Sequence, residues 1–220
     1  LMLDDAGSRL SDNNPSVSSA QISREQLELY LEMAEIAAED GFGRPLLDVH
    51  FSDAKNGFVV GAYGHLFATH DGGQHWQPMQ WAVDNPDSLH LNAVNQIGAN
   101  LFLAGEYGLL LRSQDQGQSW ELLDSPYDGS FFGLQPHGNR LYIYGLRGNL
   151  FYSDDLGNSW QPIAVDNHAS LFGSSSMDGK IAFIGANGTL VVINEVNDQP
   201  KQINTQKSET FSGIAIQGAT

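Results

Sequence analysis

The chain of 220 residues contains no cysteine, few basic residues and no long apolar run. Without cysteine it cannot form disulfides, thiolate metal sites or a cysteine nucleophile. Only 10 Lys and Arg residues stand against 26 Asp and Glu, and the net charge of −16 disfavours nucleic acids and anionic membranes as partners. No stretch approaches the roughly 20 apolar residues of a membrane-spanning helix. These absences exclude several classes of function and leave the cellular compartment open.

Motifs of several enzyme classes are also absent. The 7 histidines include no H-E-x-x-H pair and no cluster at metal-ligand spacing. His70 and His75 flank a turn, and we interpret them as loop residues; metal ligands are the alternative. No G-x-S-x-G, phosphate-binding loop or dinucleotide fingerprint occurs. We therefore expect no cofactor and no metal ion.

The first 42 residues differ in character from the rest of the chain. Residues 1–20 are polar and without periodicity, which predicts a flexible lead-in, and they show no basic and apolar segments of an export signal. Such a signal is expected to have been removed or never present. A capping box at Ser23 and Gln26, followed by apolar residues at helical spacing, predicts a helix over residues 21–42. We expect it to pack on the main domain; the alternative is a partner-binding helix.

Two repeated phrases organise residues 43–220. The phrase S/T-x-D-x-G-x-x-W ends at Trp76, Trp120 and Trp160, which are 44 and 40 residues apart. A G-x-x-G phrase begins at residues 61, 105, 145 and 185, with spacings of 44, 40 and 40. Glycine-punctuated β-like runs fill the intervals, and four strands in 40–45 residues is the period of a β-propeller blade.

The strands of the first unit can be read from the sequence. They are Leu46–Phe51, Gly57–Gly61, His65–Thr69 and a short run from Trp76. A fourth unit keeps its inner strands IAFIG and TLVVI but reads NEVNDQP in place of the longer phrase, and a fifth only begins at Phe211–Ile216. The predicted fold is an all-β propeller of four-stranded antiparallel blades with one N-terminal helix. The expected blades cover about 46–90, 91–129, 130–169, 170–209 and, in part, 210–220.

The longer phrase is expected to be structural. Its Asp can accept bonds from turn N–H groups, its Ser or Thr adds a hydroxyl, its Gly permits a positive φ, and its Trp can fill the gap between neighbouring sheets. An active site need not recur in every repeat, which favours packing over catalysis. The residues concerned are Thr69, Asp71, Gly73, Trp76, Ser113, Asp115, Gly117, Trp120, Ser153, Asp155, Gly157 and Trp160. The alternative, metal binding at Asp154-Asp155, lacks the calcium-loop pattern.

The longer phrase resembles the Asp-box, or BNR repeat, of sialidases and other propellers. The run LLDVHFSDAKNGFVVGAYGHLFATHDGGQHW, with DNPDSLHLNAV and SPYDGSFFGL, is similar to the photosystem II stability/assembly factor family and its bacterial relatives, often labelled BNR-repeat glycosyl hydrolases. The resemblance covers residues from about 24 to 216. It implies an exported, non-catalytic protein with seven blades that binds a membrane-protein partner, located in the periplasm, outside the cell or in the thylakoid lumen.

Four and a fraction units depart from the seven blades of that family. We expect that the blades before the helix are absent and that the last blade is cut short, so that the sequence is a fragment or a partly supplied chain. The chain then closes alone, stays open or associates with a second copy, because open sheets expose edges.

Partner binding is expected on the G-x-x-G turns. They join the second and third strands of each blade, at the end opposite the Asp-boxes, where propellers usually receive ligands. The flanking glycines satisfy the turn, so the residues between them can serve recognition; ordinary turn residues are the alternative. The candidates are Arg147 and Tyr107, followed by Tyr63, Glu106 and Asn187.

A sialidase-like glycosidase is the alternative function. Such enzymes need an arginine cluster for the substrate carboxylate, together with acid groups that carry the proton and the charge. The chain has six arginines, of which Arg44-Pro45 faintly resembles a sialidase element. Arg9 and Arg24 fall in the lead-in and the helix start, so a converging triad is hard to assemble.

Overall fold

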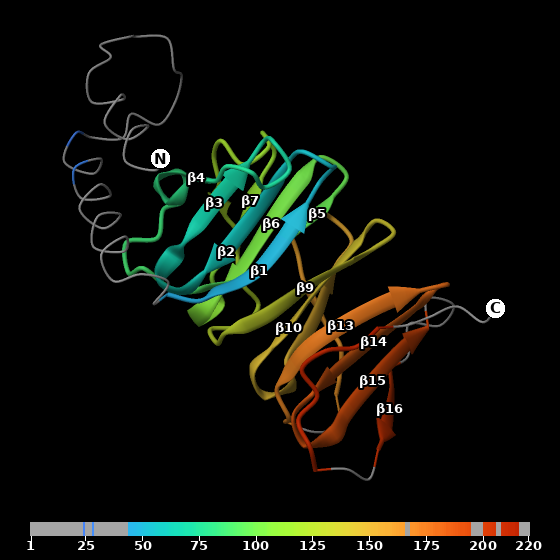
Figure 1. The fold of residues 1–220 in the computed structure, drawn as a ribbon. Helices are drawn as coiled ribbons and strands as arrows, with labels where there is room; N and C mark the ends of the chain where they lie inside the picture. The colour runs from blue at the N-terminus through green and yellow to red at the C-terminus, as the bar shows by residue number, and fades with distance from the viewer. Residues whose placement is uncertain are drawn as a thin grey trace.

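Four antiparallel sheets of four strands each form the described part of the chain (Figure 1). The computed structural model describes residues 24, 28, 44–165, 168–194, 200–205 and 208–215. The predicted lead-in and nearly all of the predicted helix lie outside these residues; Arg24 and Glu28 are helical and form an i,i+4 ion pair of 2.9 Å. No helix within the described residues is long and apolar enough to cross a bilayer.

Each sheet is a meander of consecutive strands. Blade 1 contains β1 (Leu46–Phe51), β2 (Gly57–Gly61), β3 (Leu66–Thr69) and β4 (Gln77–Pro78). Blade 2 contains β5 (Leu91–Ile97), β6 (Asn100–Gly105), β7 (Leu110–Ser113) and β8 (Glu121–Leu122). Blade 3 contains β9 (Phe131–His137), β10 (Arg140–Gly145), β11 (Leu150–Ser153) and β12 (Gln161–Pro162). Blade 4 contains β13 (Leu171–Met177), β14 (Lys180–Gly185), β15 (Thr189–Asn194) and β16 (Pro200–Asn204). These sheets confirm the predicted all-β, four-stranded architecture.

Five short 3-10 turns complete the elements seen in the described residues. Four of them follow the second strand of each blade: η1 (Ala62–Gly64), η3 (Glu106–Gly108), η4 (Leu146–Gly148) and η5 (Ala186–Gly188). The fifth, η2 (Gln80–Ala82), lies in the connection from β4 to β5. The fifth unit, predicted to begin with a strand at Phe211–Ile216, shows no strand over residues 211–215. There the backbone N–H of Phe211 donates to the carbonyl of Gly185 at 3.0 Å, but no second strand pairs with the segment.

The core lies between consecutive sheets, because alternate residues of each strand point to opposite faces. One cluster joins Phe58 and Val60 of β2 to Leu101 and Leu103 of β6. Equivalent clusters join blades 2 and 3 through Phe102 and Ile143, and blades 3 and 4 through Tyr142 and Phe183. Blades 2 and 3 therefore each present one face to the preceding sheet and one to the next.

The first strands of consecutive blades are also joined by polar contacts. Asp48 accepts a bond from the N–H of Val94 at 2.9 Å, and burial raises the pKa of this carboxyl. The side-chain amide of Asn92 donates to the carbonyl of Phe131 at 2.8 Å, and Ser174 bonds Gln135 at 2.9 Å. These bonds fix neighbouring blades in register near the centre of the fold.

The Asp-box closes the β3–β4, β7–β8 and β11–β12 hairpins with the same hydrogen bonds. In blade 3 the hydroxyl of Ser153 donates to Asp155 at 2.8 Å and accepts the N–H of Gly157 at 2.8 Å. Asp155 also accepts the N–H and the hydroxyl of Ser159, at 2.9 and 2.6 Å. These bonds, led by that from the Ser159 hydroxyl, lower the pKa of Asp155.

The Asp-box tryptophans lie against the core. Trp120 meets Phe58 of the preceding blade edge-on, with ring centroids 6.4 Å apart, and Trp160 packs on the cluster between blades 2 and 3. Trp76 instead packs on Phe51 of its own blade, at 6.0 Å. In blade 4, β16 pairs with β15 at five positions, whereas β4, β8 and β12 each pair at two. The connection from β15 to β16 falls on residues 195–199, outside the described part.

A glycine comparison tests the packing of the Asp-box turn. Gly117 has φ +84°, and a Cβ there would lie 2.6 Å from the Phe58 ring, whereas Gly98 has φ +56° and open space around it. Gly98→Ala should cost about 1 kcal/mol through its left-handed backbone alone. Gly117→Ala should cost about 1–3 kcal/mol more because it overpacks the ring. Urea unfolding measures both, and equal losses would contradict the close packing.

Acid should weaken the Asp-box. Since the folded-state pKa of Asp155 lies below its ordinary value of 3.8, the stabilisation is complete above that value and is lost as the pH falls through the folded pKa. Asp155→Asn should lower the unfolding free energy by on the order of 1 kcal/mol at neutral pH, because the group is solvent-exposed and screened. The deficit should shrink in acid. A deficit that is constant across an unfolding series from pH 7 to the acid limit of folding would refute this reasoning.

Candidate protein-binding rim

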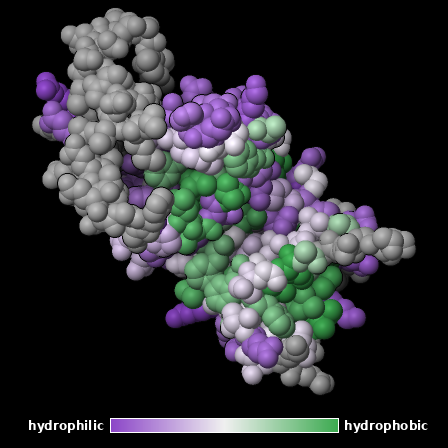
Figure 2. Space-filling view, viewed as in Figure 1, coloured by the Kyte–Doolittle hydropathy of each residue, from purple (hydrophilic) through white to green (hydrophobic). Residues whose placement is uncertain are grey.

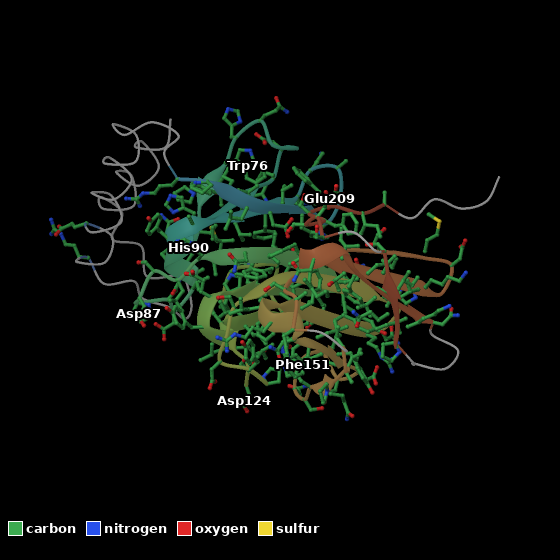
Figure 3. The ribbon with its side chains drawn as sticks, turned by 90° about the horizontal axis from the view of Figure 1, so that it is seen from below. Trp76, Asp87, His90, Asp124, Phe151 and Glu209 are labelled. Carbon is green, nitrogen blue, oxygen red and sulfur yellow. The ribbon has the colours of Figure 1, made fainter. Side chains whose placement is uncertain are left out.

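The four G-x-x-G turns lie at one end of the sheets, here called the G-x-x-G rim. The opposite end, which carries the three Asp-boxes, is the Asp-box rim. The connections from each blade to the next also cross the G-x-x-G rim; His90 and Asp87, labelled in Figure 3, lie on the connection from β4 to β5. Loop residues far apart in the chain therefore meet the turns at this end.

Each turn is held by the connection that enters its blade. The N–H of the residue after the first glycine donates to a carbonyl of that connection, as in Ala62 to Pro45 at 3.0 Å and Glu106 to His90 at 3.1 Å. The same bond joins Leu146 to Ser130, and Ala186 to Ser170, at 2.9 Å. A Cβ on the first glycine would come within 1.9–2.5 Å of that carbonyl oxygen, so only glycine fits. The rim is thus a backbone frame that repeats in all four blades.

The second residue between the glycines is in the left-handed region in every turn. The φ values are 56° for Tyr63, 50° for Tyr107, 58° for Arg147 and 54° for Asn187. Asn tolerates this conformation, but Tyr and Arg do so at a cost. Tyr63 is 52% exposed and Tyr107 is 74% exposed, so neither ring is held there by burial. Three of the four turns therefore carry a strained backbone beneath an exposed large side chain.

The predicted site residues differ in their neighbours. The Tyr63 ring lies 5.0 Å from the His90 ring, and the Arg44 guanidinium stands 5.1 Å over its face. The carboxylate of Glu106 accepts a hydrogen bond from the backbone N–H of His90 at 2.9 Å, so it stabilises the connection that carries His90. Burial, followed by the charge of Arg44, lowers the pKa of nearby His65.

The predicted site residues of blades 3 and 4 project from the rim. Arg147 is exposed, and its backbone N–H is anchored by the hydroxyl of Ser170 at 3.2 Å. Asn187 is likewise exposed. The structure brings Tyr63 together with Arg44 and His90, while Tyr107, Arg147 and Asn187 each occupy the same slot in a separate blade.

An apolar group that no sequence pattern predicted lies at the same end of the first strands. The register of each first strand shifts near its start and bypasses one residue, namely Leu47, Asn92, Phe132 or Phe172. Leu47 is 45% exposed, and the Phe132 and Phe172 rings lie 5.4 Å apart. A bulge of this kind leaves no trace in a run such as LF or FF, because it depends on strand pairing.

Apolar surface extends along the first strand. Figure 2 shows hydrophobic surface over β1, where Leu46, Val49 and Phe51 are 41–56% exposed. The corresponding residues of blade 2, Leu91 and Val94, are buried against blade 1. The outer face of blade 1 therefore has the composition of an interface between blades.

The described arginines do not converge. Arg112 bonds Glu121 at 2.7 Å and the Leu156 carbonyl at 2.7 Å, and Arg140 bonds Asp154 at 2.7 Å. Both pairs lie towards the Asp-box rim, away from Arg44 and Arg147. Among the described residues, no group of three or more His, Cys, Asp or Glu side chains is placed to hold a metal ion.

Comparisons with known proteins agree with the fold and the repeat. Residues 32–127 match the family model described as "Photosynthesis system II assembly factor YCF48". The solved structure "YCF48 bound to D1 peptide" is 23% identical, with a TM-score of 0.64 over 77% of this chain and 56% of that one. "YCF48 from Cyanidioschyzon merolae" is 20% identical, with a TM-score of 0.61 over 79% and 60%. The predicted resemblance to this family is thereby confirmed.

Another kind of propeller matches this fold equally well, and this chain spans only part of the solved structures. A WD40 β-propeller domain of Doa1, at 15% identity, matches with a TM-score of 0.61 over 77% of this chain and 57% of that one. Comparison with curated proteins gives no match. The chain spans about 56–60% of the length of these solved structures. At such identities the structures support the propeller fold.

Exchange of turn residues between blades tests the strain at the rim. Tyr107→Asn should raise the free energy of unfolding by roughly 0.5–1 kcal/mol, because Asn adopts the left-handed conformation more readily. The reciprocal change, Asn187→Tyr, should lower it by a similar amount. Both are measured by urea unfolding, and a stabilising Asn187→Tyr would show that the turn prefers tyrosine.

Proposed function

We propose that this chain, whose residues 32–127 match the photosystem II assembly factor family, is a non-catalytic, exported β-propeller that binds a protein partner through its G-x-x-G rim. The partner class is a membrane protein or its assembly intermediate, and the role is assembly or stability of a membrane complex. The observation that carries the proposal is the repeated left-handed slot that holds Tyr63, Tyr107 and Arg147 in strained turns. Such strain is a cost that a turn needing only its backbone would avoid.

The side chains in these slots suit protein recognition. Tyr and Arg are enriched among the residues that dominate binding energy at interfaces, because they combine apolar area with hydrogen-bonding groups. Here they project from a frame fixed by backbone bonds, so little backbone entropy is lost on binding. The exposed apolar residues Leu47 and Phe172 add area at the same end of the fold.

The family relation supports the choice of partner. The YCF48 structure is described as bound to a D1 peptide, so a peptide segment is the ligand of that relative. We extend this to the present chain as a segment of a membrane protein, with photosystem II as the complex concerned in a photosynthetic source. The compartment is then the thylakoid lumen or the periplasm.

A glycosidase function has less support. The dispersal of Arg44, Arg112, Arg140 and Arg147 leaves no group of guanidinium forks that could bind one carboxylate. Hydrolysis of a fluorogenic sialoside and a panel of small glycosides addresses this alternative. Turnover that Arg44→Ala abolishes would replace the binding proposal with the enzyme.

The binding proposal is tested by charge reversal at either end of the fold. Arg147→Glu should reduce, at least several-fold, the membrane proteins captured from a detergent-solubilised envelope extract, as quantified by mass spectrometry. Lys180→Glu makes the same charge change on an exposed residue at the Asp-box rim and should leave capture unchanged. Unfolding midpoints of both variants report on the fold. Equal capture by wild type and Arg147→Glu, or equal losses in both variants, would show that the rim is wrongly assigned.

A further inference from the structure

Two histidines lie near the ends of the first Asp-box turn. In blade 1, Ala68 pairs with Gln77 and Phe67 with Pro78. His70 and His75 lie just beyond this ladder, near the two ends of the turn that joins β3 to β4. Both residues line one shallow hollow of about 120 Å³, together with Ala68, Asp71 and Gln77.

The Nδ1 atom of each imidazole is bonded to an oxygen. His75 Nδ1 lies 2.6 Å from Oδ2 of Asp71, and His70 Nδ1 lies 2.8 Å from Oδ1 of Asn56. An oxygen acceptor at Nδ1 selects the tautomer with the proton on that atom. The lone pair of each Nε2 is then available as a ligand.

The turn does not require either histidine. The positions of His70 and His75 are occupied by Gln114 and Ser119 in the second Asp-box, and by Asp154 and Ser159 in the third. The hydroxyls of Ser119 and Ser159 bond their Asp residues at 2.5 and 2.6 Å, as the His75 ring does in the first box. Serine thus satisfies the Asp-box, and the imidazoles add a chemical capacity that the other two boxes lack.

We propose that His70 and His75 bind one divalent transition metal ion, such as Zn²⁺, through their Nε2 atoms. Imidazole suits Zn²⁺, Cu²⁺ and Ni²⁺, and an imidazole whose Nδ1 donates to a carboxylate or amide oxygen is the usual oriented ligand of such ions. With two protein ligands, the remaining positions are filled by water or by a group of a bound partner. The site lies at the Asp-box rim, at the opposite end of the sheets from the proposed partner-binding turns, so it is independent of that function.

The experiment is a calorimetric titration of the untagged chain with ZnCl₂. Wild type should bind one equivalent, and both His70→Gln and His75→Ser should abolish this binding. Each substitution installs a residue that the second Asp-box carries at that position, so the fold should persist, as unfolding midpoints can verify. His168→Gln, at an exposed histidine of another blade, is the matched control and should bind like wild type. Asn56→Ala should weaken binding by about tenfold, because it removes the acceptor that orients His70.

Spectroscopy with a second ion identifies the ligands. In electron paramagnetic resonance, one equivalent of Cu²⁺ should show hyperfine coupling to two imidazole nitrogens in wild type and to one in either single variant. Absence of Zn²⁺ binding would overturn the proposal. So would binding that survives both His70→Gln and His75→Ser, or a Cu²⁺ spectrum that these changes leave unaltered.

Discussion

Face-to-face packing of consecutive sheets is the interaction on which the rest of this structure depends. Leu91, Phe131 and Leu171 hold the same position at the start of the first strand in blades 2, 3 and 4, and each has no exposed surface. Leu46, in that position in blade 1, is 56% exposed. Apolar burial at roughly 25 cal/mol per Å² is thus the main favourable term at each junction. Both rims are hydrogen-bonded turns at the ends of strands that this packing has already placed.

The two rims solve the same problem of turn closure with different chemistry. The Asp-box uses an ionised side chain and a hydroxyl, which satisfy the N–H groups of a long turn and return a tryptophan to the core. The G-x-x-G turn uses a carbonyl of the incoming connection, and its glycines admit that carbonyl at close range. The first solution specifies most of its residues. The second leaves two positions open, so side-chain variety is concentrated at the G-x-x-G rim.

The regular part of the fold could be predicted from the sequence, because two phrases in phase mark the same points of every blade. β1 and β2 lie where the alternating runs placed them, and the turns lie between the expected strands. The features that the two phrases did not predict depend on contacts between segments far apart in the chain. The carbonyl of His90 on the turn at Glu106, and the bulges beside Leu47 and Phe172, follow from tertiary pairing that no local pattern encodes. The absence of a strand at residues 211–215 has the same cause, since a single run needs a paired neighbour.

Repetition makes each blade a control for the others. When the same turn occurs in several blades, the smallest side chain found at a given position shows what the fold requires there. A larger or more reactive side chain at that position in another blade then needs an explanation other than folding. Asn187 shows that the left-handed slot can be filled without a large side chain, so Tyr107 and Arg147 exceed what the turn requires. Ser159 shows that a hydroxyl completes the Asp-box, so the imidazole of His75 exceeds it as well. Tyr107 and Arg147 lie at the G-x-x-G rim, and His75 lies at the Asp-box rim. The packed sheets between the two rims keep these two sets of side chains apart.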